Sequence, residues 1–422
     1  MFKKIKKWLS LLGPGFVTGA ADDDPSGIAT YAQTGAQFGF AQLWTSLFTF
    51  PLMTCIQEMC GRIGIVTRKG LTQNLKAHYS KRLLYSTVAL LFIANAFNIG
   101  ADLGAMAESL QLVVPWLPFY PMLMAISLGT VILEIYIPYV TYAKYLKYLT
   151  LALFAYIATL FFIQLDWGEI FYATFVPHIA FTKDYFINIT AILGTTISPY
   201  LFFWQANQEV EEREANHVEE ISQAHINNLR IDTIIGMFFS NLIMWFIIVA
   251  TGATLFKNGI THISSASQAA AALRPFAGDF SSLLFAVGII GTGLLAIPIL
   301  AGSVGYAVAE MKGWPCSLAL TYGDGKKFYQ VISVTILVGT LVNFLPINPI
   351  TLLYYSAVLN GFISPILIFI ILAMANNSTI MGKHVNGTCA KWLGLLTGLV
   401  MSGNVKREVH NWAKPNCAPV CA

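Results

Sequence analysis

The sequence predicts an all-α membrane protein that crosses the bilayer many times. Apolar residues make up 56% of the chain and charged residues only 11%, with a mean hydropathy of +0.63. A soluble domain needs about a quarter of its residues charged. Apolar stretches of roughly the 20 residues needed to span a bilayer also recur along the chain. Residues 1–422 are therefore expected to form one membrane-embedded unit without a soluble domain.

The apolar stretches fall into ten candidate spans, each bounded by polar or turn-forming residues. They cover residues 13–38, 42–66, 85–112, 120–140, 146–165, 187–206, 231–256, 281–308, 329–346 and 350–374. An eleventh apolar segment, Trp392–Met401, is too short to cross by this measure. It passes into a polar tail, residues 402–422, to which the sequence assigns no function.

The distribution of lysine and arginine predicts the orientation. The amino-terminal segment and the alternate loops on its side carry nearly all of these residues, whereas the opposite loops carry only Lys183, Lys257 and Arg274. Cytoplasmic loops are enriched in positive charge, so the amino terminus is expected in the cytoplasm and the protein in the plasma (inner) membrane. The small net charge of +4 gives no indication of nucleic-acid binding. Neither a cofactor nor an obligatory protein partner is predicted.

The first span is interrupted where the middle of the membrane should lie. It carries the run Asp22, Asp23, Asp24, Pro25, followed closely by Gly27. A buried acid is costly unless it is solvated, paired or ligated, and proline removes a backbone donor and breaks a helix. Free carbonyls beside a carboxylate form the oxygen-rich site that a hard divalent cation requires. For Asp22 and Asp23 the alternative is a helix cap at the membrane surface.

The sixth span contains a similar interruption. Its sequence from Gly194 to Tyr200 places Pro199 among small hydroxyl residues, including Thr195 and Ser198, within an apolar run. Alone this pattern is also compatible with a proline kink in which the hydroxyls bond back to their own helix. Interrupted segments at corresponding places in two halves of a transporter, however, are the best sequence indication of a transport site.

A polar stripe follows one face of the third span. Asn95, Asn98 and Asp102 are spaced by three and four residues, so they share a helical face. Such a stripe either supports an ion path or forms hydrogen bonds between helices.

These residues resemble the Nramp family of divalent metal-ion transporters, whose first span carries Asp-Pro-Gly-Asn and whose sixth carries Met-Pro-His. The segment Gln57–Thr67 is also similar to the inner end of that family's second helix. The similarity runs from about Gly13 to Leu372. It implies a leucine-transporter-like fold of two inverted five-helix repeats, near residues 13–165 and 187–374, which alternates access around the interrupted helices.

The resemblance also implies a set of metal ligands. Asp24 matches the family's metal-ligating aspartate, and backbone carbonyls are implied at Ala21 and Thr195. Gly27 and Ser198 complete the implied metal site. The residues expected to support this site or to line an ion path are Asp22, Asp23, Ser26, Tyr200, Asn98 and Asp102.

Three positions of the implied metal site and one position of the third span depart from the family pattern. Gly27 replaces the asparagine, Ser198 the methionine and Tyr200 the histidine after the proline, while Ala105 stands where the third span of the family has glutamate. Loss of the thioether removes a soft ligand, and an all-oxygen, roomier site suits Mg²⁺, which keeps its waters. Loss of the histidine removes a group that titrates near neutral pH. The pattern is closest to the divergent Nramp-related branch that carries magnesium and manganese.

Three classes of function follow from these residues. The favoured one is transport of divalent cations, Mg²⁺ with Mn²⁺, and its alternative is a proton-coupled Mn²⁺/Fe²⁺ symporter of the ordinary Nramp type. A less favoured class is an intramembrane Mg²⁺-dependent prenyl transferase, which would need a second aspartate-rich motif. A symporter of amino acids is disfavoured because a carboxylate in the first span would repel the substrate carboxylate.

Overall fold

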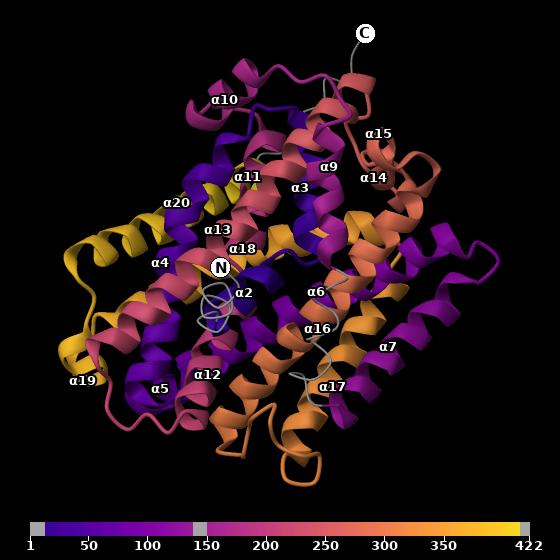
Figure 1. Ribbon diagram of the computed structural model, residues 1–422. Coiled ribbons are helices and arrows are strands. Elements are labelled where there is room, and N and C mark those ends of the chain that lie inside the picture. Colours follow the sequence, from indigo (N-terminus) through magenta and orange to yellow (C-terminus); the bar gives the residue numbers. More distant parts are fainter. Residues whose placement is uncertain (1–12, 138–149, 414–422) are drawn as a thin grey trace, which may run out of the picture.

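The computed structural model describes residues 13–137 and 150–413, and the described chain is helical (Figure 1). The first half of the chain contains α2 (Pro14–Asp22), α3 (Pro25–Phe38), α4 (Trp44–Thr67), α5 (Leu71–His78), α6 (Lys81–Val113), α7 (Phe119–Tyr136), α9 (Phe154–Leu160) and α10 (Trp167–Phe175). The second half contains α11 (Lys183–Thr196), α12 (Pro199–Ala215), α13 (Gln223–Thr254), α14 (Ala266–Ala271), α15 (Arg274–Ala277), α16 (Ser281–Lys312), α17 (Lys326–Leu341), α18 (Pro349–Ala375), α19 (Ser378–Met381) and α20 (Thr388–Ala413). Backbone groups in a bilayer must be satisfied internally, so a helical chain is what the apolar composition requires.

Seven helical segments of the described chain are long and apolar enough to cross a membrane. They are Lys81–Val113, Phe119–Tyr136, Lys183–Ala215, Gln223–Asn258, Arg274–Lys312, Lys326–Phe344 and Pro349–Ala375. The first predicted span is missing from this set because it is divided into two short helices, α2 and α3. The second, α4, carries polar and charged residues. The predicted spans 120–140 and 146–165 lie partly outside the described residues.

The two interrupted spans form the centre of the helix arrangement. The helix α13 packs against α2, α3 and α4, while α12 packs on α4 and α11 on α18. The long helix α6 contacts α16, α17 and α18. In Figure 1, α20 and α7 lie at opposite edges of the molecule, with α2, α13 and α18 between them. Each interruption is therefore enclosed by helices from both halves of the chain.

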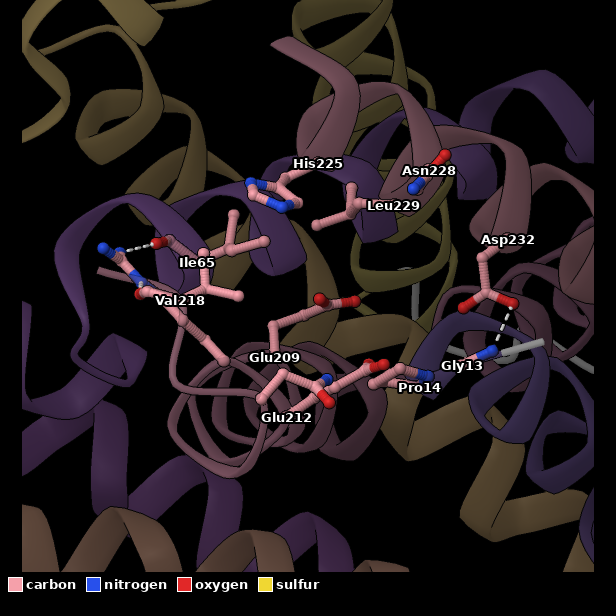
Figure 2. Close-up of a pocket in the computed structure, with 12 residues that line it drawn as sticks. Gly13, Pro14, Ile65, Glu209, Glu212, Val218, His225, Asn228, Leu229 and Asp232 are labelled. Atoms are coloured by element: carbon pink, nitrogen blue, oxygen red, sulfur yellow. Dashed lines mark hydrogen bonds between the residues drawn. The ribbon is translucent and has the colours of Figure 1, made fainter. Parts of the chain in front are cut away.

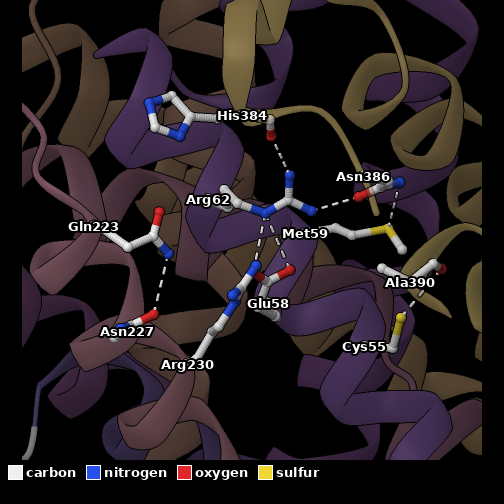
Figure 3. Close-up of polar contacts among 10 residues, drawn as sticks. All are labelled: Cys55, Glu58, Met59, Arg62, Gln223, Asn227, Arg230, His384, Asn386 and Ala390. Carbon is white, nitrogen blue, oxygen red and sulfur yellow. Dashed lines mark hydrogen bonds and ion pairs between the residues drawn. The ribbon is translucent and has the colours of Figure 1, made fainter. Parts of the chain in front are cut away.

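A set of polar contacts joins α4 to α13 and to the segment before α20 (Figure 3). Glu58 pairs with Arg62 one turn along α4 at 3.0 Å and with Arg230 of α13 at 2.9 Å. The Arg62 guanidinium also donates to the carbonyl of His384 and to the side chain of Asn386. The charges of α4 are thus satisfied by neighbouring elements, which explains how a helix with this polar segment packs within the bundle.

The helix α20 is longer than the apolar segment within it. The segment Trp392–Met401 was expected to be too short to cross and to pass into a polar tail, and α20 is not among the seven segments above. The helix itself runs over 26 residues, Thr388–Ala413, a length of about 39 Å at 1.5 Å per residue. It packs against α18, α11 and α4. Residues 402–413 of the predicted tail therefore continue the helix, and residues 414–422 lie outside the described part of the chain.

Candidate ion site

The first interruption lies between α2 and α3, at Asp23 and Asp24. Asp23 ends α2 with φ −85° and ψ 49°, and Asp24 begins α3 in an extended conformation with Pro25 at the first helical position. Proline is favoured there because its missing N–H would have no partner in any case. The three aspartates are buried, at 0%, 6% and 1% exposure for Asp22, Asp23 and Asp24. Asp22 and Asp23 therefore do not lie at an exposed helix end.

Asp24 is held by three donors. Its Oδ1 accepts from the Gly27 backbone N–H at 2.7 Å and from the Ser26 hydroxyl at 2.8 Å, and its Oδ2 accepts from Asn98 Nδ2 of α6 at 2.9 Å. The first of these bonds makes Asp24 the N-cap of α3. The carboxylate is thus fixed in orientation at the interruption, with Asn98 beside it.

Asp22 points to a different helix. Its Oδ2 accepts from the Ser240 hydroxyl of α13 at 2.5 Å, whereas its Oδ1 has no hydrogen-bond partner within the described residues. The same is true of Asp23 Oδ1. Consecutive aspartates therefore face different surroundings. Within residues 13–137 and 150–413, no three histidine, cysteine or acidic side chains come together to hold a metal.

The second interruption lies at Ile197 and Ser198, between α11 and α12. The Ser198 hydroxyl donates back to the carbonyls of Gly194 and Thr195, at 2.8 and 2.7 Å. The Ile197 carbonyl accepts from the hydroxyl of Ser364 on α18 at 2.8 Å. The back-bonding considered for an ordinary kink is therefore present, and it accompanies a complete break between two helices.

Tyr200 joins the two interruptions. Its hydroxyl donates to the carbonyl of Ala21 at 2.9 Å. At Gly27, an added Cβ would meet the Asp22 carbonyl at 3.0 Å, Thr195 Oγ1 at 3.2 Å and Asp24 Oδ1 at 3.5 Å. The position that lacks a side chain therefore opens directly onto Asp24 and Thr195. The two interruptions therefore lie against each other, with Ala21, Asp24 and Gly27 on one side and Thr195 and Tyr200 on the other.

The polar stripe of α6 divides into two roles. Asn95 donates to the Leu300 carbonyl at 2.9 Å and to the Ser303 hydroxyl at 2.7 Å, both on α16, so it connects helices. Asn98 contacts Asp24, and neither oxygen of the buried Asp102 has a hydrogen-bond partner within the described chain. Hydrogen bonding between helices therefore accounts for Asn95, whereas Asn98 lies beside the first interruption.

Sequence reasoning missed three residues around the interruptions. Ser240 donates to Asp22, Ser364 donates to the Ile197 carbonyl, and Tyr31, one turn beyond Gly27, is fully buried beside the interruption. Each is a single polar residue within an apolar helix, which carries no local signal. The periodicity of α3 could have indicated Tyr31, because residues four apart share a face.

Comparison with solved structures defines the class of protein. The chain has the leucine-transporter-like fold. It matches a manganese transporter of Eremococcus coleocola with a TM-score of 0.76 and 17% identity, covering 97% of this chain and 90% of that one. A Na⁺-coupled sialic acid symporter matches with a TM-score of 0.56 and 12% identity, covering 94% and 89%.

The sequence comparisons identify the family. Residues 15–405 match the family described as natural resistance-associated macrophage protein-like, or Nramp. Among its relatives, the divalent metal cation transporter MntH of Clostridium acetobutylicum is 28% identical over 408 residues, 93% of this chain and 89% of the relative. The corresponding protein of Caldanaerobacter subterraneus subsp. tengcongensis is 25% identical over 420 residues, 96% of both chains. The chain belongs to the Nramp family of divalent metal cation transporters. It is a membrane transporter and not an enzyme, which excludes the prenyl transferase hypothesis.

Proposed function

We propose that this protein carries Mg²⁺ as well as Mn²⁺ across the membrane by alternating access around the two interruptions. Asp24 is the charged ligand in this proposal. The neutral oxygens come from Ala21, Thr195, Gly27 and Ser198, the last as a hydroxyl or through a water. The names of the relatives support a divalent cation as cargo, and manganese is the metal named for the Eremococcus coleocola protein. With the amino terminus on the cytoplasmic side of the plasma membrane, transport would proceed inward.

The observation that carries the proposal is the unpaired negative charge at the first interruption. Asp22, Asp23, Asp24 and Asp102 are all buried, and none of them forms an ion pair with a lysine, arginine or histidine of the described chain. Buried charges without a partner are strongly unfavourable, so sites of this kind are paired or bind cations. A divalent cation supplies the missing positive charge.

The hydrogen bonds around Asp24 favour a cation that keeps part of its water shell. The Ala21 carbonyl accepts a hydrogen bond from Tyr200 and the Thr195 carbonyl accepts one from Ser198, so each has one lone pair left for the ion or for a water bound to it. Several nearby oxygens lack donors, namely Asp22 Oδ1, Asp23 Oδ1, Asn98 Oδ1 and both oxygens of Asp102. Waters on a cation are donors of the kind that these acceptors require. Because Mg²⁺ dehydrates reluctantly, this arrangement supports its acceptance.

A second candidate is proton-coupled transport of Mn²⁺ or Fe²⁺. Asp102 favours it, because an unpaired buried carboxyl group near Asp24 is a suitable proton carrier. Ala105, one turn further along α6 and fully buried, has no proton to exchange. The uncoupled function is favoured because the histidine and glutamate of the family pattern are replaced by Tyr200 and Ala105.

Exchange of Asp24 for asparagine tests the proposed ligand. Asp24→Asn retains an oxygen that caps α3 but removes the charge, so uptake of both Mg²⁺ and Mn²⁺ into proteoliposomes should fall to the background of empty vesicles. Metal-dependent thermal stabilisation should vanish with it. The matched control is Asp279→Asn, at an exposed aspartate, which should transport as the parent does. Uptake by Asp24→Asn at the parent rate would show that Asp24 is not a ligand of the transported ion.

A further inference from the structure

A cavity lies on the side of the first interruption at which α2 begins. It has a volume of about 260 Å³ and is enclosed by α2, the end of α4, α12 and the start of α13 (Figure 2). Glu209, Glu212 and Asp232 line it, together with Gly13, Pro14 and Leu229. The carboxyl end of α12 is rich in acidic residues. Glu209, however, is only 4% exposed and faces this cavity.

Acidic side chains outnumber basic ones in the lining of this cavity, three against Arg213 and His225. Asp232 accepts the backbone N–H groups of Gly13 and Gly15, at 2.8 and 2.7 Å, and so caps the amino end of α2. The Arg213 guanidinium donates to the carbonyls of Ile65, Val218 and Glu219. A cavity lined mainly by acidic groups and backbone carbonyls attracts cations.

Hydrogen-bonded polar side chains of α2 and α12 lie between this cavity and the interruption. The Thr18 hydroxyl lies 2.5 Å from Gln205 Oε1 and 2.7 Å from the carbonyl of Pro14 on its own helix, so its one proton serves two acceptors. Gln205 Nε2 donates to Glu209 Oε1 at 3.0 Å. Thr18 and Gln205 are both 0% exposed. The contact between them is about one helical turn, roughly 5.4 Å, from Asp22 along α2 and again from Glu209 along α12.

Gln205 packs closely against α4. It faces Gly61 of α4, where an added Cβ would lie 3.3 Å from Gln205 Cγ and Nε2. A larger residue at Gly61 would press against the Gln205 amide. When a contact between two polar side chains opens, water can replace the lost hydrogen bonds. A contact between apolar side chains has no such replacement when it opens.

We propose that Thr18 and Gln205 form the gate on this side of the transport path, and that the hydrated divalent cation passes between Asp22 and the acidic cavity when their contact opens. This inference rests on the proposed function, because it assumes a cation at the interruption. It assigns Gln205 a gating role through its contacts with Thr18 and Glu209, distinct from the ligand role of Asp24.

Thiol labelling tests the gate without requiring transport. The reporter is Ser240→Cys, beside Asp22 on the far side of the gate, in a chain whose six cysteines are replaced by alanine. A membrane-impermeant methanethiosulfonate reagent is added from the side of the acidic cavity. In the Gln205→Ala background, labelling should be about tenfold faster, the shift expected when two buried hydrogen bonds are lost. Thr18→Ala, which opens the gate from α2, should act in the same direction.

Gln208→Ala is the matched control, because Gln208 lies on the same helix and contacts Tyr306 of α16 at 3.3 Å. Its labelling rate should equal that of the parent reporter. Equal rates for all variants would overturn the gate. Faster labelling in Gln208→Ala as well would show general loosening and also overturn it. If the parent carried no metal but labelling followed the expected order, the proposed function would fail while the gate remained.

Discussion

Asp24 caps the start of α3, and the same hydrogen bonds orient the carboxylate that we propose as the ion ligand. Its Oδ1 caps the helix through Gly27 N–H, and its Oδ2 is held by Asn98 from another helix. Because the cap fixes the backbone after the break, the carboxylate and the free end of α3 occupy a defined position relative to Thr195. The absence of a side chain at Gly27 then determines how much room remains beside the carboxylate.

Restoring a side chain at Gly27 should change the metal preference. In Gly27→Asn the new amide enters the space between Asp24 Oδ1 and Thr195 Oγ1, at 3.5 and 3.2 Å from the Cβ position. It would displace water from a cation there, which disfavours Mg²⁺ more than Mn²⁺. The ratio of Mg²⁺ to Mn²⁺ uptake should fall about tenfold, a change of about 1.4 kcal/mol.

Gly129→Asn is the control for this exchange, because a Cβ at Gly129 meets nothing within 4 Å. Its uptake ratio should match the parent. An unchanged ratio in Gly27→Asn would mean that this space is not part of the ion site.

The sequence predicted where the two spans are interrupted but not every residue that contacts the interruptions. Asp24, Pro25 and Pro199 are conspicuous because acids and prolines are rare within apolar spans, and their physical cost suggests a function. Ser240 and Ser364 give no such signal, since a lone serine in an apolar helix ordinarily bonds to its own backbone. Their contacts with Asp22 and Ile197 depend on how distant helices pack.

At the scale of the element, α2 is a nine-residue helix held mainly by its neighbour α13. Its packing depends on glycines, because a Cβ at Gly19 would collide with the backbone of Gly236. Small residues allow such close approach of membrane helices. Asp232 adds the cap at the amino end of α2. The short helix is therefore positioned by backbone contact and one carboxylate.

Gly236→Ala tests this close packing. The added methyl group would lie 2.8 Å from Phe16 Cα and 2.9 Å from the Gly15 carbonyl carbon, so α2 must move away from α13. Overpacking of this kind costs about 1–3 kcal/mol, and the midpoint of thermal unfolding in detergent should fall. In Gly288→Ala the nearest atom is Ala152 Cβ at 3.7 Å, and the midpoint should stay near that of the parent. Equal midpoints for the two variants would contradict the close α2–α13 contact.

At the scale of the whole molecule, composition and hydropathy were enough to predict a helical membrane protein. Its fold matches that of the Eremococcus coleocola transporter although only 17% of residues are identical. Hydropathy was less informative at the carboxyl end. The helix α20 extends beyond its apolar segment on both sides. Within that segment Gly394 and Gly398 pack closely against Met59, Leu372 and Phe369.

The most direct test of the account is metal entry into proteoliposomes that contain separate dyes for Mg²⁺, Mn²⁺ and pH. The buried, unpaired oxygens around Asp24, together with Gly27, Ser198 and Tyr200, predict that both metals enter and that the vesicle interior does not acidify. Entry of Mn²⁺ alone, accompanied by acidification, would contradict the account and establish proton-coupled transport of the ordinary Nramp type.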